Sequence, residues 1–189
     1  MNQSKLSYYA EFFIYPLVFA GLLLSDLASS GFDAHRRWLL AALGGAVLWT
    51  FAEYLVHRFL YHKVAVLKHL NGRHHAYPSD LIGAPSWVSV VIFVSFFALI
   101  ARFSDLQTAS GATAGLIAGY VLYLLVHDAV HHWQLTGQSP FHAWLRSCRL
   151  RHLRHHRDPV PGNFGVVTGL WDAVFGTMLA TGRTRTRSA

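Results

Sequence analysis

Cysteine and charged residues are scarce in this chain of 189 residues. A single cysteine, Cys148, excludes an intramolecular disulfide framework and any zinc site built mainly on thiolates. Charged residues make up 13% of the chain, whereas soluble domains usually carry about 25%. Hydrophobic residues make up 53%. These proportions predict a membrane protein rather than a soluble one.

Motifs for electron-carrying cofactors are missing as well. The sequence has no Gly-x-Gly-x-x-Gly turn, no cysteine motif for an iron–sulfur cluster and no fused haem domain. It has only nine acidic residues, and it lacks the paired Glu and Glu-x-x-His motifs of a carboxylate-bridged di-iron bundle. A redox reaction would therefore need a separate electron donor, and a metal site would need ligands other than carboxylates.

Four long apolar runs are present, each close to the roughly 20 residues that cross a hydrocarbon core. We expect about four transmembrane helices, near residues 8–26, 38–57, 84–102 and 109–126, in a single all-α membrane domain covering residues 1–189. The third and fourth runs are short and closely joined. They could therefore form a helical hairpin that does not fully cross the membrane. The first run lacks the basic start and cleavage site of a secretory signal, and we expect it to be retained.

The basic residues are distributed unevenly around these runs. The net charge is +7 with histidine neutral. If the N-terminus is cytoplasmic, thirteen of the sixteen Lys and Arg residues face the cytoplasm, as the positive-inside tendency requires. The expected negatively charged partner of these basic residues is the anionic head groups of membrane lipids, not nucleic acid. Residues 181–189 are expected to form a basic tail.

Thirteen histidines are the unusual feature of the composition. Most lie in residues 57–75 and 127–156, in blocks that follow the apolar runs, and all but His35 fall on the cytoplasmic side of the predicted topology. Positions three or four apart share a helix face, so His127 and His131 can point at one place. The same spacing of three or four residues relates His152 to His155 and to His156. His57 and His62 are five apart and converge only if their helix ends or distorts between them.

Clustered imidazoles of this kind indicate a metal site. Neutral imidazole binds iron, zinc and copper, and the number of clustered histidines is enough for two ions. The pattern therefore predicts an all-histidine dinuclear site in a cytoplasmic helical cap. His69 and His132 are additional candidates. Glu53 lies one turn before His57 and could orient it or pair with an arginine, and Asp128 could act likewise.

The blocks, taken in order, resemble the fatty acid hydroxylase / sterol desaturase superfamily. The segments are HRFLYH, GRHHAYPSDLIGAP, HDAVH, RHLRHH and NFGVVTGLWDAVFGT, and the resemblance runs from about Glu53 to Met178. The resemblance implies a membrane oxidoreductase with a di-iron centre that uses O₂ to hydroxylate or desaturate a lipid. The implied ligands are His57, His62, His74, His75, His127, His131, His152, His155 and His156. No organic cofactor and no catalytic residue beyond the ligands is implied.

One position departs from the family pattern, because Asn71 stands where a histidine is usual. Its amide oxygen could still bind a metal ion, but more weakly than imidazole. The expected cofactors are two iron ions, for which zinc could substitute, with O₂ as co-substrate. The expected partners are a membrane lipid (fatty acyl or sterol-like) and a separate ferredoxin or cytochrome-type donor with its reductase. The alternative is a non-catalytic metal-binding membrane protein or a metal transporter.

Overall fold

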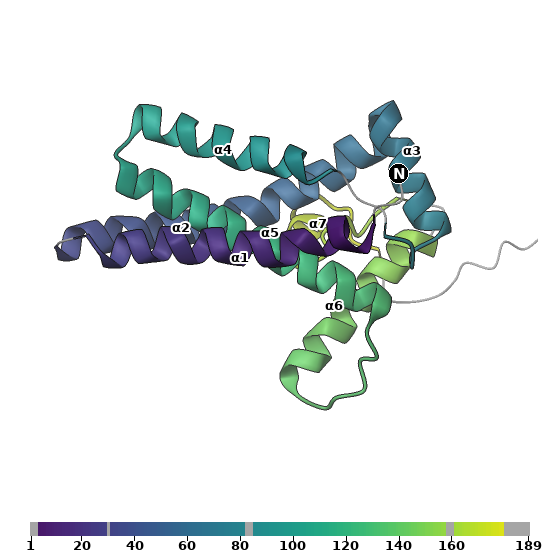
Figure 1. Ribbon diagram of the computed structural model, residues 1–189. Helices are drawn as coiled ribbons and strands as arrows, with labels where there is room; N and C mark the ends of the chain where they lie inside the picture. Colours follow the sequence, from purple (N-terminus) through teal and green to yellow (C-terminus); the bar gives the residue numbers. More distant parts are fainter. Residues whose placement is uncertain (1–3, 30, 82–84, 158–160, 180–189) are drawn as a thin grey trace, which may run out of the picture.

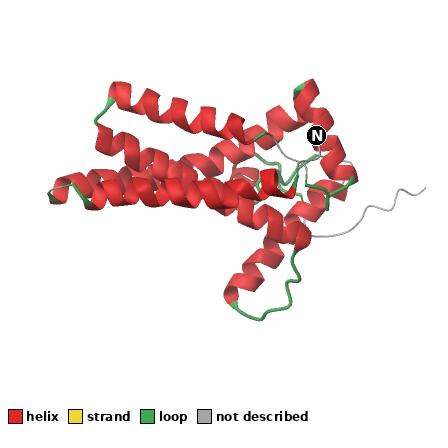
Figure 2. Cartoon of the chain, viewed as in Figure 1, coloured by secondary structure: helices red, strands yellow, loops and turns green. Residues whose placement is uncertain are grey.

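Helices form every regular element of the residues that the structure describes, which are 4–29, 31–81, 85–157 and 161–179. The structure is a computed structural model. The elements are α1 (Lys5–Leu27), α2 (Phe32–Leu55), the π-helix η1 (Val56–Tyr61), α3 (Ala65–Ala76), α4 (Ser86–Phe103), α5 (Leu106–His132), α6 (Pro140–Arg157) and α7 (Leu170–Val174). Figure 2 shows helices and loops but no strand in this part of the chain. The expected all-α class is confirmed.

Four helical segments are long and apolar enough to cross a membrane. They are Lys5–Leu27, Phe32–Tyr61, Ser86–Phe103 and Leu106–His132. Each matches an expected run, and three of them extend beyond it at both ends. The start of the third run, residue 84, and the expected tail at 181–189 lie outside the described residues. Figure 1 shows α1, α2, α4 and α5 running alongside one another as a bundle.

The helices α2 and α5 make the closest contact in the bundle, and they do so at small residues. A Cβ added to Gly115 would lie 1.8 Å from the carbonyl oxygen of Ala42. A Cβ added to Gly45 would lie 2.1 Å from the carbonyl oxygen of Ala112. Lipid tails are as apolar as the side chains, so close van der Waals packing, not water exclusion, holds membrane helices together. Glycine at these positions makes that approach possible.

Helix α5 links the bundle to the rest of the protein, because it contacts α1, α2, α4 and α6. Among the long helices, one buried apolar cluster contains Tyr15, Phe93, Leu116 and Ile117. A second contains Val126, Ala129, Val130, Leu145, Cys148, Val166 and Val167. The second cluster fastens α6 and the segment 161–169 to the last turns of α5. It thereby fixes the elements that carry the histidines.

The elements α3, α6 and α7 lie at one end of the bundle, the end at which α1 begins (Figure 1). Together with segment 161–169 they form the helical cap that the sequence predicts. The histidine blocks lie in this cap and in the adjoining ends of the long helices. The side of the membrane on which the cap lies stays a prediction.

Candidate metal centre

Four elements deliver the predicted ligands to one place. His57 lies in η1 and His62 directly follows it, α3 carries two of the predicted ligands, α5 carries two and α6 carries three. The structure gathers eight of the nine into two groups of four, each with potential ligand atoms within 4.8 Å of one another. The first group is His57, His62, His75 and His155, and the second is His74, His131, His152 and His156.

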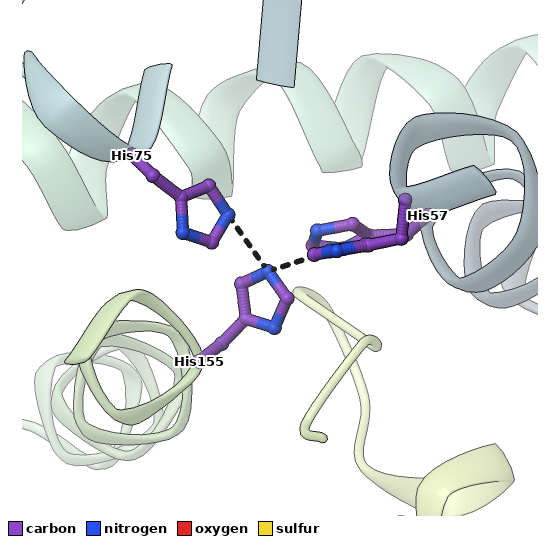
Figure 3. A group of neighbouring side chains, drawn as sticks. His57, His75 and His155 are labelled. Carbon is purple, nitrogen blue, oxygen red and sulfur yellow. Dashed lines mark hydrogen bonds between the residues drawn. The ribbon is translucent and has the colours of Figure 1, made fainter. Parts of the chain in front are cut away.

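The first group is formed by residues from η1, from the position directly after it, from α3 and from α6. The Nε2 atom of His155 lies 3.1 Å from Nε2 of His75 and 3.3 Å from Nε2 of His62. Figure 3 shows His57, His75 and His155 extending from three separate elements towards a common point. No acidic residue is a member of this group.

The second group joins α3, α5 and α6. Nε2 of His152 lies 2.8 Å from Nε2 of His131 and 3.0 Å from Nε2 of His156. The ninth predicted ligand, His127, lies outside both groups of four but beside this one, with its ring centroid 4.9 Å from that of His74 and 4.8 Å from that of His131.

The nitrogen geometry of both groups fits a metal ion. Two nitrogens bound to one ion at about 2.1 Å lie about 3.0 Å apart at a right angle and about 3.4 Å apart in a tetrahedron. The observed Nε2 separations, from 2.8 to 3.3 Å, fall close to that range. In addition, Nε2 of His74 is buried and has no hydrogen-bond partner in the described part of the chain. A buried polar nitrogen left in this way is costly unless an ion or water satisfies it.

Burial keeps the cap imidazoles neutral, which is the form that binds metals. It lowers the pKa of His74 and of His156 to about 3, and neighbouring imidazoles lower both further. Burial also lowers the pKa of His155 to about 4, although its hydrogen bond to the carbonyl of Gly162 opposes the shift. An unperturbed histidine titrates near pH 6.5, so these side chains are ready to ligate at neutral pH.

The π-helix explains how two histidines five residues apart reach the same group. In η1 the backbone bonds skip one more residue than in an α-helix, so positions five apart approach one face. His57 and His62 consequently have ring centroids 5.5 Å apart. The sequence indicated that a distortion was needed here, and the structure supplies it as a π-helical turn at the end of α2.

Two backbone carbonyls orient predicted ligands, and sequence reasoning missed both. Nδ1 of His57 lies 2.6 Å from the carbonyl oxygen of Phe164, and Nδ1 of His155 lies 2.8 Å from that of Gly162. A carbonyl can only accept, so each Nδ1 carries the proton and each Nε2 keeps a lone pair for a metal. The NFG motif was the available signal, but a motif does not show where its carbonyls point.

Buried carboxylates hold this carbonyl-bearing segment in place. Asp172, which is fully buried, accepts hydrogen bonds from the backbone N–H of Phe164 at 2.9 Å and of Gly165 at 2.8 Å. Oε1 of Glu53 accepts from the backbone N–H of Val166 and of Val167. Within the residues that the structure describes, the hydrogen bonds of Glu53 go to this backbone, and none joins it to His57 or to an arginine side chain. Glu53 positions the segment whose Phe164 carbonyl orients His57.

The remaining candidates take different places. Asn71 lies beside the first group, with its Nδ2 atom 3.3 Å from Nε2 of His62. His69 is exposed and lines a surface hollow on α3 instead. His132 lies outside both groups and 4.0 Å from Asp128. Asp128 also accepts a hydrogen bond from the indole of Trp133 at 2.9 Å.

A cavity of about 320 Å³ opens beside the second group and runs between the long helices. His57, His74, His127 and His152 lie at one part of its wall. The wall is mostly apolar, and its apolar members include Trp49, Val56, Leu67, Leu70, Val88, Ile92, Phe93, Leu116 and Leu124. An apolar cavity between membrane helices suits a lipid chain.

Comparison with known proteins gives consistent matches. Residues 42–177 match the family described as fatty acid hydroxylase. The chain is 32% identical over 165 residues to a dihydroceramide fatty acyl 2-hydroxylase of Arabidopsis thaliana, covering 82% of this chain and 67% of the relative. It is 33% identical over 148 residues to the fatty acid 2-hydroxylase of Mus musculus, covering 71% of this chain and 38% of the relative. It thus spans much less than half of the mouse relative.

A solved structure agrees with these relatives. The chain superposes on full-length scs7p, of which only the hydroxylase domain is visible, with a TM-score of 0.73 and 28% sequence identity. The match covers 92% of this chain and 67% of that one. Because the family match extends over most of the chain and the fold agrees, the chain belongs to the fatty acid hydroxylase family, which confirms the resemblance and the expected class of membrane oxidoreductase.

Proposed function

We propose that the chain is an O₂-dependent hydroxylase that acts on a C–H bond of a membrane lipid at a centre of two iron ions. The observation that carries the proposal is the pairing of two four-histidine groups in one cap. The two relatives, which are named as a dihydroceramide fatty acyl 2-hydroxylase and a fatty acid 2-hydroxylase, support a lipid substrate and favour hydroxylation over desaturation.

Two iron ions, when bound, would supply the oxidising chemistry that a saturated C–H bond requires and that side chains alone cannot provide. Each four-histidine group would hold one of them, with His127 beside the second. Zinc suits the same nitrogens and could substitute without the redox chemistry. Imidazole ligands also resist oxidation better than thiolates, which are oxidised stepwise.

The protein's own residues have three tasks in this proposal. The carbonyls of Gly162 and Phe164 fix the rings of His155 and His57, so that Nε2 faces inward. The apolar cavity wall binds the lipid chain and excludes water from the site. The cavity also directs one part of that chain towards the histidines, which selects the carbon that reacts.

Electrons would come from a separate ferredoxin or cytochrome-type protein with its reductase. Helix α6 supports this proposal because it carries three predicted histidine ligands together with five arginines. The arginines are Arg146, Arg149, Arg151, Arg154 and Arg157. Opposite charge steers an acidic donor towards such a helix. The same basic residues support a cytoplasmic cap through the positive-inside tendency.

Lipid mass spectrometry of cells tests the proposal. Cells that contain the wild-type protein are expected to accumulate a lipid carrying one additional oxygen atom. Cells that contain the His155→Ala variant, or no protein, are expected to lack it. His69→Ala is the matched control, since His69 is exposed and outside both groups, and it should retain the product.

Metal analysis of the purified protein completes the test. About two iron ions per chain, with O₂ uptake that depends on added lipid and reductant, is the expected result. Bound metal without any lipid-dependent O₂ uptake would contradict the hydroxylase and favour a non-catalytic metal-binding protein. Transport of metal into vesicles would favour the transporter instead.

A further inference from the structure

A polar cluster lies inside the bundle, away from the histidines. Glu11 of α1 is 8% exposed. Its Oε1 accepts a hydrogen bond from the Ser89 hydroxyl of α4 at 2.8 Å, and its Oε2 accepts one from the Tyr120 hydroxyl of α5. The Tyr15 hydroxyl in turn donates to Ser89 at 2.7 Å. Within the residues that the structure describes, no cation lies within ion-pair distance of Glu11.

A carboxylate is a costly residue with which to fasten apolar helices. Ionisable groups inside membrane segments are rare and usually functional, and a serine or glutamine would tie α1 to α4 and α5 at lower cost. A carboxylate offers about four acceptor positions, and hydroxyl groups of the protein use one on each oxygen. The cluster therefore retains unused capacity to accept hydrogen bonds.

The cluster lines the same cavity as the histidines. Glu11, Ser89 and Tyr120 belong to the wall of the 320 Å³ cavity, as does His127. Tyr120 and His127 lie two helical turns apart on α5, a separation of about 10 Å along the helix axis. A single ligand in this cavity can therefore contact Glu11 and the histidine end together. The wall between them is largely apolar.

We propose that Glu11, with Ser89 and Tyr120, binds a hydrogen-bond-donating polar group of the lipid, a hydroxyl or an amide N–H, about 10 Å from the histidines. This inference rests on the proposed function for the existence of a lipid substrate. A free carboxylate would meet like charge at Glu11, and an ester has no proton to donate. The recognised group is then distinct from the carbon that is oxidised.

Competition binding with purified protein tests the site without any turnover. The probe is tritiated octadecanol, and the competitors are octadecanol, octadecanamide, methyl stearate and stearic acid, which share one chain length. For the wild-type protein, the alcohol and the amide are expected to compete about tenfold better than the ester and the acid, because a bond to a charged acceptor contributes about that much. Equal competition by octadecanol and methyl stearate would overturn the proposal.

The variants separate recognition from simple helix packing. In Glu11→Gln the preference for octadecanol over stearic acid should fall about tenfold, because the charge is gone. Glu11→Asp keeps the negative charge, but its shorter side chain holds the carboxylate further from the ligand. Octadecanol should therefore bind about tenfold more weakly while stearic acid is still rejected. If both variants keep the wild-type ranking, Glu11 only connects helices.

Ser110→Ala is the matched control. It breaks a buried tie between α2 and α5, the 3.2 Å bond from the Trp38 indole to Ser110, and Ser110 does not line the cavity. Its competitor ranking should equal that of the wild type. The two proposals also fail separately: absence of an oxygenated lipid in cells contradicts the hydroxylase, whereas the competitor ranking depends on binding alone.

Discussion

Nδ1 of His57 lies 2.6 Å from the carbonyl oxygen of Phe164, although 107 positions separate the two residues in the chain. The contact connects the end of a membrane helix to a segment that follows α6. It fixes the tautomer of His57, because a carbonyl only accepts. The geometry of the candidate metal centre therefore depends on the buried carboxylates that hold this segment.

Replacing Asp172 by asparagine should weaken both the fold and the metal site. Asp172 accepts from the backbone N–H of Phe164 and of Gly165 and from the Thr177 hydroxyl. An asparagine turns an NH₂ group towards one of these donors, so the free energy of unfolding should fall by about 3 kcal/mol. Denaturant unfolding in detergent measures this change. Asp33→Asn is the control, because its side chain is 74% exposed and its ion pair with Arg36 should contribute little.

Helix α3 offers a matched pair for counting metal ions. His75→Ala removes a member of the first group, so the purified protein should lose most of the ion bound there while the second ion remains. His69→Ala on the same helix should leave the metal content unchanged, since His69 is exposed on the cap surface. Elemental analysis distinguishes the two. Equal metal content in both variants would contradict the assignment of His75.

Asn71→His should strengthen the first group. The Asn71 amide already lies 3.3 Å from Nε2 of His62, and imidazole is a better ligand than an amide for iron and zinc. We expect metal to dissociate from the variant at least several times more slowly in the presence of a chelator. Asn71→Ala should release metal at the wild-type rate or faster. A chelation time course that is the same for all three proteins would show that position 71 is not near the metal.

Acid should destabilise the metal-free protein. Burial holds the pKa of His74 and His156 near about 3 and that of His155 near about 4, whereas the unfolded chain takes up protons near pH 6.5. Below about pH 6.5 the unfolded state therefore binds more protons, and the free energy of unfolding falls as the pH drops towards about 4. The loss is up to about 1.4 kcal/mol per pH unit for each such histidine. Unfolding curves across this range check the slope, and a flat profile would contradict neutral burial.

The contact between α2 and α5 should tolerate no side chain at Gly115. A Cβ there would lie 1.8 Å from the Ala42 carbonyl oxygen, so Gly115→Ala must push the helices apart and should cost about 2 kcal/mol or more. Gly44→Ala is the control on α2, because nothing lies within 4 Å of its added Cβ. Its thermal midpoint should stay the same or rise slightly. Similar midpoints for both variants would rule out close packing at Gly115.

Several features of the fold followed from the sequence because they depend on local chemistry. The four apolar runs predict four membrane helices, since the hydrocarbon core sets the length that a helix must cover. The spacing of His152 and His155 places them on one face of α6, since the helix period is fixed. The interval between His57 and His62 indicated a distortion, which is the π-helix η1. Each of these depends on residues within a few turns of one another.

The partners of the buried carboxylates could not be predicted in the same way. Glu53 was recognised as an unusual acidic residue in an apolar run, yet its hydrogen bonds go to the backbone of Val166 and Val167. Asp128 accepts a hydrogen bond from Trp133 and lies 4.0 Å from His132, which is outside both histidine groups. Glu11 lies before the residues that match the family, and only the packing of α1 against α4 and α5 brings it to the cavity wall.

By itself, the sequence determined the number of membrane runs, the class of ligand and which histidines share a helix face, because periodicity and side-chain chemistry are local properties. The tertiary structure alone decided how the histidines divide into two groups of four, which carbonyls orient them and where the cavity runs. Those features require η1, α3, α5 and α6 to meet. Their meeting depends on contacts between residues far apart in the chain, which no local pattern encodes.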